Sequence, residues 1–325
     1  AERYTIEVPD IEYYQKNINC QNACPVRTDA RGYVNAIAEG HYDQAYVMAR
    51  QPNPFAYTCG RVCMAPCESA CRRGAIDKPV AIRALKRFVT ENFGVEAKLR
   101  QPGSQPSPLE WTPGNSQTWE STAVMAKVGP APLRRQAKIA IIGSGPAGLT
   151  AAHDLARLGY RVTVFERNAA PGGAMMDYIP IYRLPRDLLM KDVEAIIALG
   201  VEIKARQELG KDFTIADLKK QGYEAILLSM GLPLSRTPRV PGEDMEGVLL
   251  ALPFLQSVNQ AGYRLPPNKT IIVVGGGNVA IDVARAALRA GAAGVRLGCL
   301  EAPHEMPAYP WEIEEAREEG IEINC

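Results

Sequence analysis

The chain has 325 residues, of which 46% are hydrophobic and 22% are charged, as is usual for a globular protein with a substantial core. Its 37 basic and 36 acidic residues leave a net charge of +1, which excludes the broad basic surface that binding to nucleic acid or anionic membranes requires. No stretch approaches about 18 consecutive apolar residues, and the first residues do not resemble a secretion signal. We therefore expect a soluble, cytoplasmic protein without a membrane span.

The first feature along the chain is a cysteine-rich segment, which we predict to be a helical domain over residues 1–95. It holds six of the eight cysteines, among stretches with helical periodicity such as "YVNAIAEGHYDQAYVMARQ". The run "YTCGRVCMAPCESACRRG" places four cysteines at intervals of four, and disulfides, a metal site or a buried run of small residues would each explain it. In a cytoplasmic protein, clustered cysteines are more often metal ligands or redox groups than disulfides.

The geometry of this run depends on Pro66. A straight helix over residues 59–71 would spread the thiols over about 18 Å, at about 1.5 Å per residue, which is too far for one metal centre. Pro66 breaks such a helix and allows the chain to fold back, and Cys20 and Cys24, the latter followed by Pro25, can bring further ligands. The C-x3-C spacings and the Cys-Pro step favour an iron–sulfur cluster, with zinc and free thiols as the alternatives.

Residues 96–136 are predicted to be a linker. They are rich in Pro, Gly, Ser and Gln and have no hydrophobic period. Trp111 and Trp119 indicate that this linker is held against a surface rather than free.

From Lys138 onward, short β-branched runs alternate with helices rich in small residues. This alternation predicts an α/β fold with parallel sheets and crossover helices. We divide it into two Rossmann-like modules, an FAD-binding domain over residues 137–255 and an NAD-binding domain over residues 256–325, of which the second is incomplete.

The first module carries a dinucleotide-binding pattern. Gly143, Gly145 and Gly148 follow G-x-G-x-x-G between a strand and a helix, and Glu166 ends the next strand. In such a turn the glycines permit the tight bend, the approach of a pyrophosphate and close helix packing, while the acid accepts hydrogen bonds from a ribose. A glycine-rich turn that binds nothing is the alternative.

The second module repeats the pattern with Gly275, Gly277 and Ala280, and its second strand ends at Glu301. Two such modules suggest two dinucleotides, most economically a flavin and a nicotinamide nucleotide. Hydride transfer between these cofactors depends on stacking, and the three histidines form no recognisable triad or zinc pattern. We therefore predict no catalytic side chain.

Together these motifs resemble a known family. The segments "CQNACPV", "NPFAYTCGRVCMAPCESACRRG", "IAIIGSGPAGL", "YRLP", "VVGGGNVAID" and "EMPA" are similar to those of the small (β) subunit of bacterial glutamate synthase and of the N-terminal half of dihydropyrimidine dehydrogenase. The resemblance implies an NAD(P)H-oxidising flavoprotein that transfers electrons through iron–sulfur clusters to a partner subunit or domain.

The resemblance also implies particular cofactor-binding residues. For FAD these are Gly143, Gly145, Pro146, Ala147, Gly148, Leu149, Glu166, Gly173, Arg183 and Leu209. For the nicotinamide nucleotide they are Gly276, Gly277, Asn278 and Val279, to which the glycine pattern adds Gly275.

The family often has a further cysteine pair upstream, where this chain has Glu12 and Gln15. We therefore expect one [4Fe-4S] cluster, with two clusters as the alternative. The family pattern groups as ligands Cys24, Cys63 and Cys67. It leaves Cys20 or Cys71 as the fourth ligand and Cys59 as the spare thiol.

The end of the second strand in the second module bears on the choice of nucleotide. NADPH-using members of the family resemble one another in a Tyr-Arg-Arg at this place, where this chain has Cys299, Leu300 and Glu301. A carboxylate repels a 2′-phosphate and accepts a hydrogen bond from a ribose hydroxyl, so we predict NAD. A solvated surface glutamate is the alternative for Glu301.

These inferences predict an NADH-dependent FAD and iron–sulfur oxidoreductase module that exchanges electrons with a partner subunit. The alternatives are a non-catalytic electron-wire or assembly subunit and an NADPH-specific subunit of the glutamate synthase type. The first of these is suggested by the final "EGIEINC", which falls inside the second module, whereas the family continues beyond it. A dithiol enzyme like thioredoxin reductase is disfavoured, because no C-x-x-C follows the flavin module.

Overall fold

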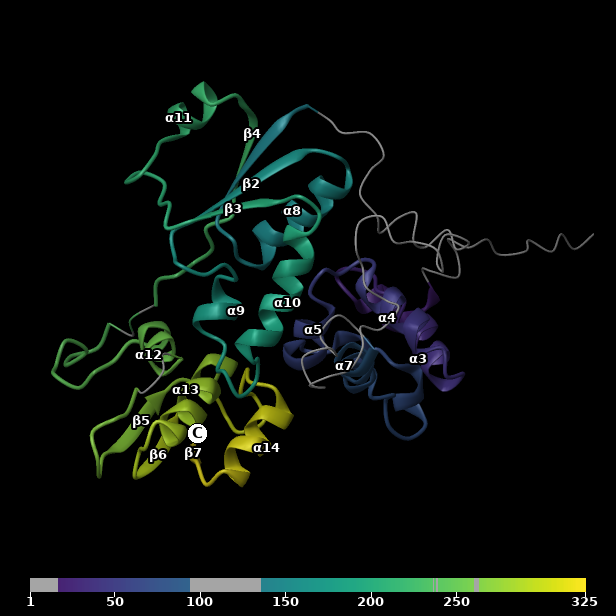
Figure 1. Cartoon of the computed structure of the whole chain (residues 1–325). Helices are drawn as coiled ribbons and strands as arrows, with labels where there is room; N and C mark the ends of the chain where they lie inside the picture. Colours follow the sequence, from purple (N-terminus) through teal and green to yellow (C-terminus); the bar gives the residue numbers. More distant parts are fainter. Residues whose placement is uncertain (1–16, 94–135, 236, 238, 260–262) are drawn as a thin grey trace, which may run out of the picture. The chain divides into compact units, whose positions relative to one another are not determined.

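A computed structural model describes residues 17–93, 136–235, 237, 239–259 and 263–325 (Figure 1). It divides into two compact units: the first contains the described residues up to Pro171 together with Arg186–Ser229, and the second contains Gly172–Pro185 and the described residues from Met230 to Cys325. The predicted linker over 96–136, with Trp111 and Trp119, lies outside the described residues apart from its last position.

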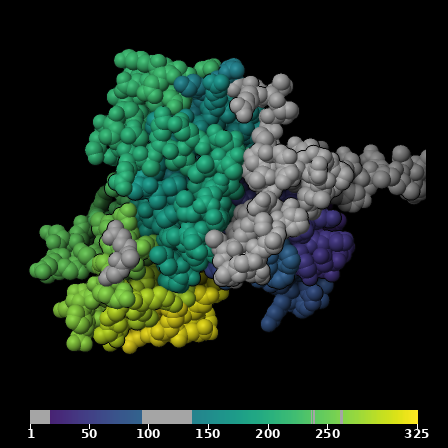
Figure 2. Space-filling view, in the orientation of Figure 1, coloured from purple at the N-terminus to yellow at the C-terminus, as the bar shows by residue number. Residues whose placement is uncertain are grey.

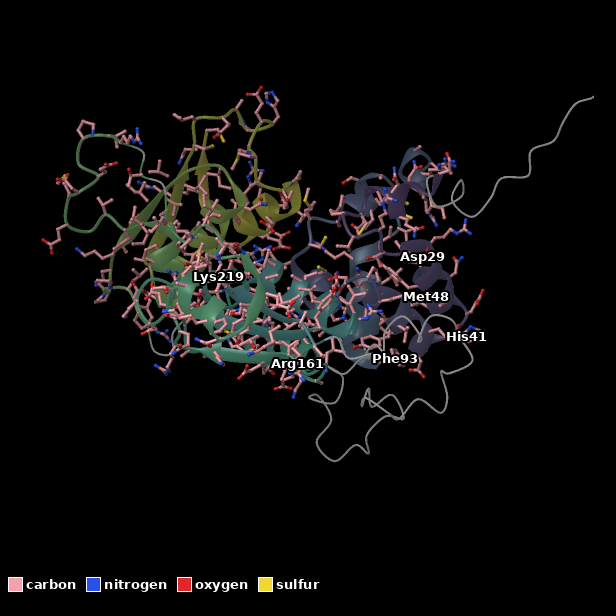
Figure 3. All side chains as sticks on the ribbon, turned by 90° about the horizontal axis from the view of Figure 1, so that it is seen from above. Asp29, His41, Met48, Phe93, Arg161 and Lys219 are labelled. Atoms are coloured by element: carbon pink, nitrogen blue, oxygen red, sulfur yellow. The ribbon has the colours of Figure 1, made fainter. Side chains whose placement is uncertain are left out.

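The first unit begins with a helical domain, residues 17–93. Its helices are α2 (Asn19–Ala23), α3 (Ala30–Ala38), α4 (Tyr42–Arg50), α5 (Ala56–Val62), α6 (Pro66–Ser69) and α7 (Ile82–Phe93), with a 3₁₀ turn, η1 (Arg72–Ala75). Alanines and tyrosines of α3 and α4 pack against α7, where the Tyr33 hydroxyl donates to the carbonyl of Ile82 at 3.2 Å. Figure 3 labels Asp29, which caps α3 by accepting from the Gly32 N–H, and Phe93, which ends α7.

The sequence predicts that the cysteine run of this domain is broken at Pro66, and the structure shows such a break. Helix α5 ends at Val62, Cys63 takes an extended conformation, and Ala65 has a left-handed φ of 55°. Pro66 then occupies the first position of α6, where its missing N–H is not needed for the helix. The earlier stretch over 33–51 likewise forms two helices, because the chain turns at Gly40 with a φ of 80°.

The first unit also contains a four-stranded parallel sheet in the order β3-β2-β1-β4. Its strands are β1 (Lys138–Ile142), β2 (Arg161–Glu166), β3 (Glu202–Ala205) and β4 (Tyr223–Leu228), connected through α8 (Pro146–Arg157), α10 (Arg186–Ile197) and α11 (Ile215–Lys220). Strands β2 and β3 are added in turn on one side of β1, and β4 is then added on its other side. Ligands of open α/β sheets bind where the strand order reverses in this way, so the turn after β1 is the expected site.

The second unit is built on a three-stranded parallel sheet in the order β5-β6-β7. Its elements are α9 (Ala174–Asp177), α12 (Ala251–Val258), β5 (Thr270–Val274), α13 (Asn278–Arg289), β6 (Gly294–Gly298), α14 (Pro310–Glu318) and β7 (Glu322–Asn324). Apolar residues of α13 pack on this sheet, and α14 lies against α13. The C-terminal residues of this unit form the yellow surface in Figure 2. These two sheets confirm the predicted fold class. Among the described residues, no helix combines the length and apolar character that a membrane crossing requires.

A buried carboxylate connects the helical domain to the first sheet. Asp192 of α10 is 0% exposed. Its Oδ1 accepts from the Arg50 guanidinium at 2.9 Å, and its Oδ2 accepts from the N–H and the hydroxyl of Thr58 at 3.2 and 3.0 Å. A buried charge is tolerated when it is paired and hydrogen-bonded in this way. Asp192 therefore holds α10 against α4 and α5.

Replacing Asp192 with Ala should destabilise the first unit by about 3–5 kcal/mol, because it leaves the partly buried guanidinium of Arg50 without this counter-charge. Urea unfolding measures the loss of unfolding free energy. Faster limited proteolysis of the helical domain would show that its helices have been released from α10. Glu194→Gln is the matched control, since Glu194 lies on the same helix but forms an exposed pair with Lys191. Equal stability of the two variants would show that Asp192 does not join the two parts.

Candidate cofactor sites

The first glycine turn joins β1 to α8. Gly143 has a φ of 101°, a conformation that favours glycine, and its N–H donates to the carbonyl of Phe165 at 2.8 Å. Gly145 is the N-cap of α8 and Pro146 is its first residue, and both Pro146 and Ala147 are exposed. A 12-residue helix thus begins at an open surface, where its unpaired N–H groups and its dipole favour an anionic phosphate.

The other two glycines of the pattern have different tasks. A Cβ placed on Gly148 would overlap the carbonyl oxygen of Gly143 and come within 2.6 Å of the Ser229 hydroxyl, while the next residue, Leu149, is fully buried. A Cβ placed on Gly145 would meet nothing within 4 Å. Gly148 therefore lets the helix pack on the sheet, whereas Gly145 leaves room above the helix end.

Glu166, at the end of β2, is 5% exposed and faces this turn. Its Oε2 accepts from the N–H and the hydroxyl of Ser144 at 3.0 and 2.6 Å, and its Oε1 accepts from the N–H of Asn168 at 2.8 Å. A carboxylate offers about four acceptor positions, so these bonds fix the group and leave capacity for a ribose hydroxyl.

The remaining predicted FAD ligands are divided between the two units. Leu209 belongs to the first unit and packs against the apolar cluster that contains Phe165 and Phe213. Gly173, with a φ of 53°, and Arg183 belong to the second unit. The Arg183 guanidinium donates to Asp282 at 2.6 and 2.7 Å and to Glu312 at 2.5 Å. Its part in binding FAD remains a prediction.

The second glycine turn reproduces the first. Gly275 follows β5 with a φ of 135°, and Gly277 is the N-cap of the 12-residue helix α13. A Cβ on Gly277 would meet nothing within 4 Å, and Val279 in the first turn of the helix is 48% exposed. This helix end is therefore also open to a phosphate.

Residues just before α14 hold the second turn in place by hydrogen bonds. The Gly276 carbonyl accepts from the N–H of Ala308 at 3.0 Å, and the Asn278 side chain accepts from the N–H of Tyr309 at 2.9 Å. Oε2 of Glu301 would lie 2.9 Å from a Cβ on Gly276. The structure thus brings Glu301 against the turn, although the two are separated by a strand and a helix in sequence.

The five predicted cluster ligands lie on short helices of the helical domain or directly beside them. They are Cys20 within α2, Cys24 at its C-cap, Cys63 after α5, Cys67 within α6 and Cys71 just before η1. Helices α2 and α6 are in contact, so the upstream pair lies beside the later run.

Electrostatic interactions relate these thiols to one another. The pKa of Cys67 is raised to about 11. Burial is the largest cause, and the negative charges of the Cys63 and Cys24 thiolates add to it. Burial also raises the pKa of Cys20, and Cys71 contributes to that rise. For Cys24, burial opposes ionisation, but hydrogen bonds with Thr28 and Val26 and the charge of Lys86 together outweigh it and lower the pKa.

The chemistry of this donor set fits an iron–sulfur cluster. Thiolates are the usual ligands of such clusters, and bound iron would offset the burial and mutual repulsion that keep Cys67 protonated. Within the described ranges, no group of three or more His, Cys, Asp or Glu side chains already stands in a metal-binding arrangement. The assignment of individual ligands therefore remains a prediction.

Lys86 is a residue that sequence reasoning missed. It lies on α7 and is 8% exposed, its ammonium stands 5.7 Å from the centre of the Tyr33 ring, and its charge lowers the pKa of both Cys24 and Cys67. A lysine on a helix is normally taken as solvated. The signal was its position four residues after Ile82 and three before Val89, on the apolar face of the helix.

Two family models match the chain. Residues 13–97 match dihydropyrimidine dehydrogenase domain II, 4Fe-4S cluster. Residues 137–325, more than half of the chain, match pyridine nucleotide-disulphide oxidoreductase.

Curated relatives are subunits of larger enzymes. The chain is 41% identical over 310 residues to the NADP(+)-dependent formate dehydrogenase subunit beta of Moorella thermoacetica, covering 93% of this chain and 42% of that protein. It is 36% identical over 309 residues to the NADPH-Fe(3+) oxidoreductase subunit beta of Geobacter sulfurreducens, covering 93% and 41%. It is 32% identical over 308 residues to the NAD-dependent dihydropyrimidine dehydrogenase subunit PreT of Salmonella typhimurium, covering 94% and 67%. The chain thus spans less than half the length of the first two.

Among solved structures, Mycobacterium tuberculosis FprA in complex with NADPH superposes with a TM-score of 0.50 and 22% sequence identity, over 57% of this chain and 48% of that one. At this identity the likeness concerns the fold.

Two glycine variants separate ligand binding from packing. Gly145→Ala should lower the unfolding free energy of the FAD-free chain by less than about 1 kcal/mol, the cost of alanine at an N-cap, since the φ of −70° suits alanine and the space is empty. It should weaken FAD binding at least about tenfold by blocking the pyrophosphate. Gly148→Ala should instead destabilise the chain by about 1–3 kcal/mol through overpacking. Thermal unfolding and flavin titration measure both effects. Similar profiles for the two variants would contradict this division of tasks.

The predicted ligand set is tested by iron and acid-labile sulfide analysis. Cys63→Ser should lose most of the cluster, whereas Cys59→Ser, the matched control one helical turn earlier, should keep it. The family pattern leaves Cys59 as the spare thiol, so its replacement should not release iron. Cys20→Ser and Cys71→Ser, compared with each other, identify the fourth ligand. Equal loss of iron in the Cys63 and Cys59 variants would refute the assignment.

The paired glycine turns, the thiol-bearing helices and the matched family models agree with one another. The chain is an iron–sulfur and pyridine-nucleotide oxidoreductase module, and it belongs to the pyridine nucleotide-disulphide oxidoreductase family, with an N-terminal domain of the dihydropyrimidine dehydrogenase 4Fe-4S type.

Proposed function

We propose that this chain is the NADH-dependent electron-transfer module of a multi-subunit oxidoreductase. It would exchange electrons between NADH, FAD, one [4Fe-4S] cluster and a partner subunit, in the cytoplasm. The observation that carries the proposal is that the first glycine turn and the thiol-bearing helices belong to one compact unit, joined through Asp192.

In this proposal the chain binds and orients its cofactors. The open end of α8 would hold the FAD pyrophosphate, and Glu166, fixed by Ser144, would hold the ribose. The clustered thiols would hold the iron. When bound, a flavin exchanges electrons in pairs with a nicotinamide and singly with an iron–sulfur cluster, which is why both belong in one module. The partner subunit is supported by the relatives, which are named as subunits.

The choice of NADH rests on the second glycine turn. Glu301 faces Gly276, and Leu300 beside it is fully exposed. A carboxylate here favours a ribose diol and opposes a 2′-phosphate, and neither Cys299 nor Leu300 supplies the positive charge that a phosphate needs. NADPH is the second candidate, favoured by the names of the Moorella and Geobacter relatives, whereas the Salmonella relative is named NAD-dependent.

The nucleotide preference is measured as anaerobic flavin reduction by NADH and by NADPH in the FAD-loaded chain. A charge-assisted hydrogen bond contributes about 1.5–3 kcal/mol, so NADH should be favoured about tenfold to a hundredfold, and Glu301→Arg should reduce or reverse that preference. Glu305→Arg, in the same connection, makes the same change of charge and is the matched control. Equal or better reduction by NADPH in the unmodified chain would sink the NADH assignment. No reduction by either nucleotide would favour a non-catalytic electron-wire subunit.

A further inference from the structure

Two cysteines outside the helical domain stand side by side in the second unit. Cys299 follows β6 and Cys325 follows β7, and these strands pair in parallel with Gly298 opposite Asn324. The N–H of Cys299 donates to the carbonyl of Asn324 at 3.0 Å, which continues the pairing by one residue. The two sulfur atoms are 3.4 Å apart.

This placement suits a disulfide. Neighbouring strands lie about 4.8 Å apart, within the range of about 4.4–6.8 Å that separates the Cα atoms of bonded cysteines. A disulfide bond is about 2.0 Å long, so the sulfur atoms need to approach by only about 1.4 Å. Side-chain rotation with small shifts at the strand ends can supply that movement, and the sheet itself need not rearrange.

The same two thiols adjoin the second glycine turn. A Cβ on Gly276 would lie 3.1 Å from the Cβ of Cys299 and 2.9 Å from Oε2 of Glu301. The Cys299 thiol also stands 3.7 Å from the carbonyl oxygen of Glu301, to which it donates. Drawing Cys299 toward Cys325 would break this contact and move the chain that positions Glu301 against the turn.

We propose that Cys299 and Cys325 form a reversible dithiol–disulfide pair that controls how tightly the second glycine turn binds its pyridine nucleotide. This rests on the proposed function, in which that turn holds the nucleotide. The disulfide weakens binding, because hydrogen bonds to a ribose depend on the position of Glu301 to within tenths of an ångström. By linkage, bound nucleotide favours the dithiol by the same factor.

The oxidant is a low-molecular-weight disulfide such as oxidised glutathione. One protein thiolate attacks it, forming a mixed disulfide and releasing one small thiol, and the other protein thiolate then displaces the second. One sulfur–sulfur bond forms in the protein and one breaks in the oxidant. Two electrons and two protons pass from the protein thiols to the oxidant, which leaves as two thiols.

The test uses the cofactor-loaded chain, equilibrated anaerobically in buffers of oxidised and reduced glutathione. Peptide mass spectrometry detects the Cys299–Cys325 cross-link, and calorimetric titration with NADH and NADPH measures affinity in each state. We expect the cross-link to form and the affinity for the preferred nucleotide to fall at least tenfold. Saturating nucleotide should shift the midpoint of oxidation toward higher oxidised glutathione.

The Cys325→Ser variant keeps Cys299 at the turn but cannot form the cross-link. In every buffer it should bind nucleotide as tightly as the reduced chain does. It therefore distinguishes the effect of this disulfide from the effect of oxidising the cluster thiols. Absence of the cross-link across the buffer series overturns the proposal, and so does a cross-link that leaves affinity unchanged. If the fully reduced chain binds neither nucleotide, both the proposed control of nucleotide binding and the proposed function are overturned. The cross-link is detected independently of binding, so this outcome can be distinguished from absence of the disulfide.

Discussion

The buried carboxylate of Asp192 is the contact on which the arrangement of the first unit depends. A charge without exposure is costly unless its partners are in place, so the ion pair with Arg50 and the bonds from Thr58 form only in one docking geometry. Removing one partner leaves the other charge uncompensated, so the pair favours this one arrangement. Because Thr58 adjoins Cys59 on α5, the same contact positions the helix that leads into Cys63.

The two glycine turns share one local backbone geometry, which the proposed function assigns to two different dinucleotides. Each places a glycine with positive φ after a strand and opens a 12-residue helix. They differ in the acid that faces them: Glu166 is buried and held by Ser144, whereas Glu301 lies at a half-buried edge beside Cys299. In the proposed function both turns would hold a phosphate, and selectivity would come from the end of the second strand.

The helical domain gathers like charges that need compensation. Thiolates repel one another when buried, and the ammonium of Lys86 is a nearby cation that lowers the pKa of Cys24 and Cys67. Burial still raises the pKa of Cys67 to about 11. The domain is therefore built for a positively charged inorganic partner, consistent with the family to which residues 13–97 belong.

The sequence by itself determined the features that depend on consecutive residues. The break at Pro66, both glycine turns and the alternation of strands with helices follow from local backbone preferences, which hold wherever the segment lies. Tertiary structure decided the rest. Asp192 meets Arg50 across 142 positions, and Cys299 aligns with Cys325 through strand register. No local pattern encodes these contacts, because each requires elements remote in sequence to pack before the side chains can meet.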